Sequence, residues 1–285
     1  MRRLRIEHLT EYRFPSTVQL LPHRLLLRPR EDHNLRIASS KLDIAPAAQL
    51  RWQRDPLDNS IVVASFRDAT RTLSIRSEVI VEHYDAAPLD FLVEPYAATT
   101  PFAYTDAELL SLAPYRAPSW PQDRATVASW LSSQGQHSGA RDTFSVLDGL
   151  NRSIPQLLRY ASREEAGVQS PALTLARGTG SCRDFAALFM DACRALGFAC
   201  RFVSGYHTSY ANEVGPGSTH AWAEVYIPGP GWKGFDPTAG VVTGNQHIAV
   251  AFAVHPELVP PISGSYLGSA EPKPSLHVFV RVVGA

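Results

Sequence analysis

The stretch Gly178-Thr179-Gly180-Ser181-Cys182-Arg183-Asp184-Phe185-Ala186 joins a glycine-containing turn to the start of an apolar helix. Apolar residues then recur at helical spacing, which predicts a helix from Cys182 to Leu196 that ends at Gly197. Its expected apolar face comprises Phe185, Leu188, Phe189, Ala192 and Leu196. A cysteine in the first turn lies among unpaired N–H groups, which favour the thiolate. Cys182 is therefore a candidate nucleophile.

A histidine and an aspartate follow in a pattern that can activate this cysteine. The segment 219–225 predicts a strand in which His220 and Trp222 share one face, and Asp236 ends the next strand after the hairpin Gly229-Pro230-Gly231. Antiparallel pairing sets Asp236 beside His220. A carboxylate there would fix the imidazole tautomer and stabilise the imidazolium that keeps the sulfur ionised.

These residues lie in three segments that resemble the motifs of the bacterial transglutaminase-like superfamily, whose core is similar to that of papain-like cysteine proteases. The segments are Gly178 to Ala186, Ser218-Thr219-His220-Ala221-Trp222 and Gly234-Phe235-Asp236-Pro237-Thr238. The resemblance covers roughly residues 143–238, and the preceding strands resemble the β-rich N-terminal region of many bacterial members. It implies Cys182 as nucleophile, His220 as general base and acid, and Asp236 as orienting group, with no cofactor.

The other cysteines do not form a recognisable site. Cys193 and Cys200 make no CxxC pair and lack histidines at zinc spacing, so we expect packing roles and no metal. The same structural role is the alternative for Cys182, as a small apolar residue that begins a core helix.

Several neighbours of the site have open roles. The backbone N–H of Cys182 is one candidate donor to an oxyanion, and Tyr160 or Gln169 is a candidate for the second. Asp184 fits a structural role in the first helical turn. Trp222 is a candidate shield for the imidazole or an ordinary buried aromatic, and His207 is expected to face solvent beside the loop 208–217.

The fold class expected for the chain is α+β. A papain/transglutaminase-like core, in which a helix bundle packs on an antiparallel sheet, is preceded by an all-β sandwich-like domain. We expect the β-rich domain and a proline-rich connector in residues 1–122 and the catalytic domain in residues 123–285. Expected strands are 3–14, 60–66, 71–83, 198–206, 220–227, 232–235, 247–254 and 276–283. Expected helices are 125–133, 143–160 with Thr143 as N-cap, and a short one opened by Thr105.

Composition narrows the classes of partner. The 285 residues have a formal net charge of zero, which gives no reason to expect nucleic acid or an anionic membrane surface. The N-terminal residues 1–14 alternate where a secretory signal would be continuously apolar, and no segment is long and apolar enough to span a bilayer. We therefore expect a cytoplasmic protein, while its oligomeric state stays open.

Two functions of different classes remain. The first is a thiol-dependent enzyme that transfers acyl groups from amide bonds of peptides or proteins, by hydrolysis or transamidation, with a Cys-His-Asp triad. Within it, a peptidase or amidase is favoured over a cross-linking enzyme. The second is a non-catalytic binding or assembly module that keeps the fold and recognises a partner through its β-rich half.

Overall fold

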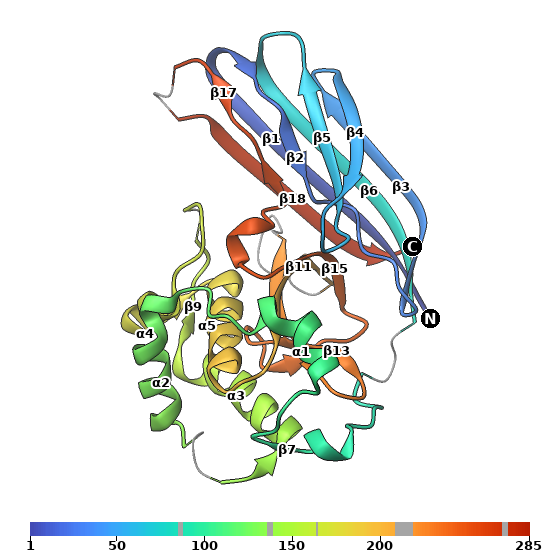
Figure 1. Ribbon diagram of the computed structural model, residues 1–285. Helices are drawn as coiled ribbons and strands as arrows, with labels where there is room; N and C mark the ends of the chain where they lie inside the picture. Colours follow the sequence, from blue (N-terminus) through green and yellow to red (C-terminus); the bar gives the residue numbers. More distant parts are fainter. Residues whose placement is uncertain (85–87, 136–138, 164, 209–218, 270–272) are drawn as a thin grey trace.

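The computed structural model describes residues 1–84, 88–135, 139–163, 165–208, 219–269 and 273–285. Figure 1 shows a β-rich part above a part that mixes helices and strands. The two chain ends lie beside each other, and the N–H of Ala285 donates to the carbonyl of Arg3 at 3.0 Å. The expected α+β class with a β-rich N-terminal region is therefore confirmed.

The β-rich part is a sandwich of two antiparallel sheets. Buried apolar side chains from both sheets form its core and include Phe14, Val18, Leu25, Val62 and Leu73. One sheet contains β1 (Arg2–Leu20), β3 (Leu35–Ala45), β6 (Thr70–His83), β17 (Tyr266–Leu267) and β18 (Ser275–Gly284). The other contains β2 (His23–Leu25), β4 (Ala48–Arg54), β5 (Ser60–Phe66) and β16 (Ile262–Ser263).

The C-terminal strand corrects the expected assignment of residues 123–285 to one catalytic unit. β18 pairs with β1 from Leu4 opposite Gly284 to Arg13 opposite Ser275, so it completes the sandwich. Alternation of apolar residues predicts that a strand forms but not which strand it joins. The division near residue 122 stays a prediction, whereas strands β16, β17 and β18 return to the N-terminal sheets.

Short elements connect the two parts. They are η1 (Pro95–Ala97), β7 (Thr99–Thr100), α1 (Asp106–Leu112), η2 (Ala113–Tyr115) and η3 (Pro121–Asp123). Thr105 opens α1 as expected, through a capping box with Glu108. No helix among the described residues is long and apolar enough to cross a membrane.

Four helices and several two-residue bridges form the helical layer of the lower part. They are α2 (Arg124–Ser133), β8 (Arg141–Asp142), α3 (Thr143–Leu157), β9 (Arg159–Tyr160), α4 (Pro171–Arg177), β10 (Thr179–Gly180) and α5 (Cys182–Ala195). Thr143 is not the N-cap of α3, because its hydroxyl donates to Ala97 while Asp142 accepts from the N–H of Ser145. The sequence interpretation also missed α4, which is too short to show a clear apolar period.

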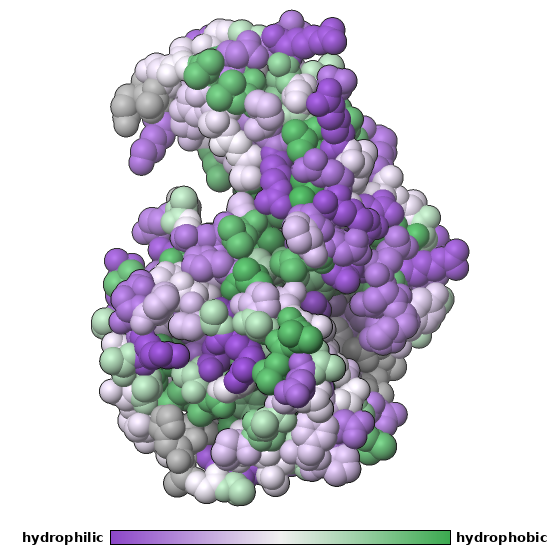
Figure 2. All heavy atoms as spheres, in the orientation of Figure 1, coloured by the Kyte–Doolittle hydropathy of each residue, from purple (hydrophilic) through white to green (hydrophobic). Residues whose placement is uncertain are grey.

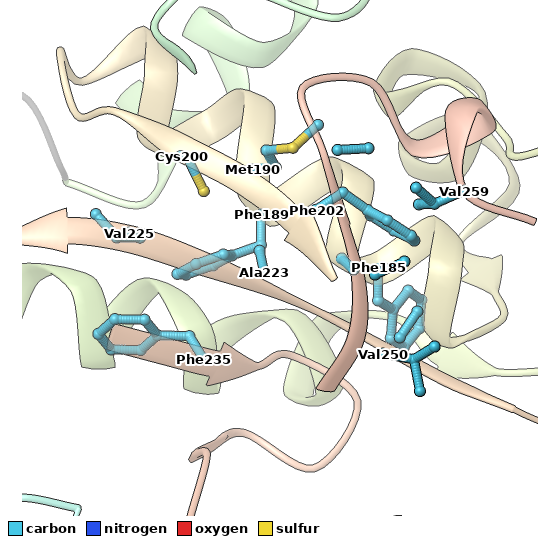
Figure 3. Close-up of a cluster of buried hydrophobic side chains, with 14 of the residues drawn as sticks. Phe185, Phe189, Met190, Cys200, Phe202, Ala223, Val225, Phe235, Val250 and Val259 are labelled. Carbon is cyan, nitrogen blue, oxygen red and sulfur yellow. The ribbon is translucent and has the colours of Figure 1, made fainter. Parts of the chain in front are cut away.

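A five-stranded antiparallel sheet carries the rest of the lower part. Its order is β14 (Val241–Val242), β13 (Gly231–Asp236), β12 (His220–Ile227), β11 (Cys200–His207) and β15 (His247–Ala253), and the short η4 (Pro256–Leu258) follows β15. Helix α5 packs on β11 and β12, and α2, α3 and α4 cover its other side. Figure 3 shows Phe185, Phe189 and Met190 of α5 among side chains of the sheet.

The N-terminal sandwich covers the outer edge of β15. The N–H of Arg30 donates to the carbonyl of Ala249 at 2.9 Å, and the side-chain amide of Asn59 exchanges two 2.8 Å hydrogen bonds with the backbone of Phe252. His83 Nε2 lies 3.1 Å from the carbonyl of His247. These contacts satisfy backbone groups that an exposed edge strand would leave unpaired.

We predict that Val280→Asp lowers the free energy of unfolding by about 3 kcal/mol or more, because Val280 is 1% exposed and a carboxylate there would be buried without a partner. The matched control is Phe279→Asp, one residue away on the opposite face and 36% exposed, for which we expect a loss of about 1 kcal/mol. Urea denaturation of both variants measures the difference. Equal losses would contradict the packing role assigned to β18.

Candidate active site

The local sequence places Cys182 at an open helix tip. Gly178 ends α4 with φ 62°, in the left-handed region that glycine adopts readily. A side chain at Gly180 would lie 2.9 Å from the Cβ of Asp184, so only glycine allows the chain to approach the helix this closely. Cys182 then begins α5 and stays partly exposed.

Asp184 fixes the start of α5 and has the structural role expected for it. Its side chain is fully buried and accepts from both the N–H and the hydroxyl of Ser181, each at 2.8 Å. Arg163 donates to it at 2.9 Å, and the backbone N–H of Gln169 donates at 2.8 Å. Desolvation would raise the pKa of Asp184, but these hydrogen bonds hold it below its ordinary value. The segment around residues 163–169 is thereby tied to the helix tip.

The structure brings all three predicted site residues together. His220 Nε2 lies 2.8 Å from Asp236 Oδ2, and the Cys182 side chain is close enough to His220 to raise the pKa of its imidazole. Because Nε2 faces the carboxylate, the nitrogen left for the sulfur is Nδ1. His220 is 4% exposed and Asp236 is fully buried. The Asp-His-Cys order in space is the one that nucleophilic thiol chemistry requires.

Burial and charge act in opposite directions on this pair. Desolvation alone would lower the pKa of His220, but the Asp236 carboxylate and the Cys182 sulfur outweigh it and raise that pKa to about 10. Burial would raise the pKa of Asp236, whereas His220 and then His247 hold it well below its ordinary range. Across neutral pH the site therefore holds an imidazolium beside the sulfur and a carboxylate behind it.

The two candidates for the second oxyanion donor differ in their position relative to Cys182. Gln169 is buried, its side-chain amide donates to Asp184 at 3.0 Å, and it does not line the cavity that contains Cys182. Tyr160 is 40% exposed and lines the cavity that contains Cys182. Desolvation, then the nearby sulfur, raises the pKa of Tyr160 to about 12, which keeps its hydroxyl a hydrogen-bond donor at neutral pH.

The sulfur opens into a cavity of about 400 Å³. One wall is formed by Tyr160, Cys182 and His220, and the facing wall by residues 256–263, which run from β15 back to the sandwich. That second wall is mostly apolar and includes Pro256, Val259, Pro260 and Ile262. The cavity is large enough for a side chain and a short stretch of backbone.

Comparison with known proteins shows the family to which the chain belongs. Residues 4–82 match the bacterial transglutaminase-like N-terminal region, and residues 133–237 match the transglutaminase-like superfamily. An uncharacterized protein of Mycobacterium tuberculosis is 30% identical over 297 residues, which cover 94% of this chain and 89% of the relative. The chain belongs to the transglutaminase-like superfamily.

Two further proteins are similar to almost the whole chain. An uncharacterized protein of Mycobacterium leprae is 24% identical over 291 residues, with 94% of each chain covered. The crystal structure of a proposed cysteine protease from Cytophaga hutchinsonii superposes with a TM-score of 0.76 at 20% identity and covers 99% of this chain and 90% of its own. At this identity the superposition establishes the shared fold.

Two histidines near Cys182, His220 and Asp236 were missed by the sequence interpretation. His207 was expected to face solvent, but it is 6% exposed, and its ring packs against His247 and His220 with centroids 4.4 and 5.4 Å apart. Burial lowers the pKa of His207 to about 3, with His247 and His220 contributing next. His247 was recognised only as the start of a strand. The signal that could have identified both histidines is their position at strand ends. Four polar residues lie at strand ends on the same edge of the sheet: His207, His220, Asp236 and His247.

His207, Asp236 and His247 are also the group among the described residues that could hold a metal ion, with ligand atoms within 4.8 Å of one another. Two imidazoles and a carboxylate are a donor set that zinc accepts. However, His247 Nε2 already donates to Asp236 Oδ2, and a metal bound between these two atoms would have to replace that hydrogen bond. We therefore assign the cluster to the hydrogen-bond network around Asp236.

The remaining candidates have packing roles. Cys193 and Cys200 are fully buried and contact each other as free thiols. Burial, then the neighbouring Cys200, raises the pKa of Cys193 well above its ordinary value, which makes it unreactive. Trp222 is 2% exposed, and its ring centroid lies 6.1 Å from that of His220, so it keeps water from one side of the imidazole. The loop 208–217 was expected to border the site, and residues 209–217 of it lie outside the described residues.

We predict that iodoacetamide labels Cys182 at pH 6.5 much faster than Cys193 or Cys200, because an imidazolium lies beside a partly exposed sulfur while the other two thiols are fully buried. His220→Ala should slow the labelling of Cys182 by at least about 10-fold. Mass spectrometry of tryptic peptides against time measures the rates. His277→Ala, which removes an exposed histidine on β18, is the control and should leave them unchanged. Equal labelling of Cys182 with and without His220 would refute the pairing.

Proposed function

We propose that the protein is a thiol-dependent acyl-transfer enzyme that acts on amide bonds of peptides or proteins. The observation that carries this proposal is the alignment of Cys182, His220 and Asp236 at the wall of an open cavity. Membership of the transglutaminase-like superfamily supports the same chemistry, and the fold shared with a proposed cysteine protease is compatible with it. A binding module would have no need for a buried carboxylate aligned behind a histidine and a partly exposed thiol.

In the proposed reaction the sulfur of Cys182 attacks the amide carbonyl carbon and a C–S bond forms. The tetrahedral intermediate collapses as the C–N bond breaks, and His220 gives its proton to the departing amine. Water or a second amine then attacks the thioester and loses its proton to His220. The C–S bond breaks and the sulfur regains its electron pair, which restores the starting ion pair. Water gives hydrolysis and an amine gives transamidation.

Residues of this chain can orient His220 and stabilise the oxyanion in these reaction steps. Asp236 holds the His220 ring in the orientation that leaves Nδ1 toward the sulfur. The N–H of Cys182 belongs to the first turn of α5 and has no acceptor within the helix, so it can donate to the oxyanion. Tyr160 is the second proposed donor, because it lines the same cavity and keeps its proton at neutral pH.

The cavity favours a particular type of substrate. Its facing wall of Pro256, Val259, Pro260 and Ile262 offers apolar surface, which suits an apolar side chain next to the amide that is cleaved. Hydrolysis is favoured over cross-linking, as in a peptidase or amidase.

We predict that Cys182→Ala abolishes both hydrolysis of a fluorogenic peptide-amide library and incorporation of a fluorescent primary amine into casein. The reason is that both reactions pass through the same thioester. Cys193→Ala is the control and should keep most activity, because that thiol is buried in the core. Thermal unfolding of both variants shows that the fold is retained. Turnover at the parent rate in the Cys182 variant would exclude the proposed mechanism.

A further inference from the structure

The catalytic carboxylate has a second imidazole bonded to it. Asp236 Oδ2 lies 2.8 Å from His220 Nε2 and 3.1 Å from His247 Nε2, and Asp236 Oδ1 accepts from the N–H of Thr238 at 2.9 Å. The carboxylate is fully buried, so protein donors replace water around it. The proposed mechanism uses the contact between Asp236 and His220. It assigns no role to His247.

The backbone fixes which nitrogen of His247 carries the proton. The N–H of Gly244 donates to His247 Nδ1 at 3.4 Å, which requires that nitrogen to be an unprotonated acceptor. The backbone N–H of His247 donates a 2.9 Å hydrogen bond to the carbonyl of Gly244. Both the ring and the backbone of His247 are therefore bonded to Gly244. The proton of a neutral ring is then on Nε2 and points at Asp236.

The surroundings hold this ring neutral and in place. The titratable groups that face it are His207 from β11, His220 from β12, Asp236 from β13 and His83 from β6. Burial lowers the pKa of His247 more than Asp236 raises it. Trp222 packs edge-on against the ring with centroids 5.3 Å apart. A neutral donor holds the carboxylate in place and adds no second positive charge next to the imidazolium of His220.

We propose that His247 is a positioning residue of the triad, which donates its Nε2–H to Asp236 and so keeps the carboxylate ionised and aimed at His220. This inference rests on the proposed function and deepens it. The donor has a further anchor outside the catalytic sheet, because the carbonyl of His247 is bonded by His83 of the N-terminal sandwich. The sandwich therefore contacts the triad through a single intermediate residue.

The experiment compares His247→Leu, which removes the donor at similar volume, with His247→Gln, whose side-chain amide can donate from nearly the same position. We expect the Leu variant to lower the iodoacetamide labelling rate of Cys182 at pH 6.5 between about 10-fold and 100-fold, the range for losing a hydrogen bond to a charged group. The acid limb of its pH–rate profile should move to higher pH, because Asp236 becomes easier to protonate. The Gln variant should recover most of both changes.

A second readout tests the protonation state of His247 directly in the parent protein. In the parent protein labelled with ¹⁵N-histidine, long-range ¹H–¹⁵N spectra at pH 7 should show the ring of His247 neutral and protonated on Nε2. The peaks are assigned by their loss in the Gln variant. A ring protonated on Nδ1, or on both nitrogens, would overturn the proposal.

The outcomes separate this inference from the proposed function. If the parent protein does not label rapidly at Cys182, the proposed function fails first. If the parent labels rapidly, and the Leu and Gln variants both label within about twofold of it, the function stands and the positioning role of His247 is refuted. If both variants slow equally with an unchanged pH profile, His247 serves only packing, which also refutes it.

Discussion

Helix α5 has to be buried along its length and open at its first residue. Every residue from Asp184 to Arg194 is buried between the sheet and the other helices, whereas Cys182 reaches the cavity. The first turn of such a helix carries N–H groups that need acceptors. Asp184 solves this by accepting from Ser181 and, on its outer side, from Arg163, so a buried charge is fully bonded and the helix tip stays free for chemistry.

The sheet meets the helix tip with the ends of its strands. His220 begins β12, Asp236 ends β13, His207 ends β11 and His247 begins β15, so neighbouring antiparallel strands deliver polar residues to one edge of the sheet. Residues in strand interiors are fixed by the hydrophobic core on both sides. Strand ends have no such constraint, which is why a buried cluster of imidazoles and one carboxylate can form there without disturbing the packing of the sheet.

The sequence predicts which residues lie together at the site better than it predicts their surroundings. The proximity of Cys182, His220 and Asp236 could be predicted because each residue stands beside a strong local signal, a helix start or a strand end. The role of His247 could not, because it depends on pairing between β11 and β15 and on a hydrogen bond across the sheet. The partner of β18 was missed for the same reason: period-two alternation specifies a strand and a face, whereas the partner is set by contacts far along the chain.

The same long-range contacts explain why the sandwich and the five-stranded sheet form one structure. β15 is an edge strand, and an uncovered edge would leave backbone groups open to pairing with other chains. Arg30, Asn59 and His83 occupy that edge, and Leu4 and Ile6 of β1 share a continuous apolar core with Phe185 of α5. Because the strand that they cover also carries His247, any loosening of the sandwich would reach the Asp236 carboxylate through one residue. The β-rich half thus contacts the strand that carries His247, the residue bonded to Asp236.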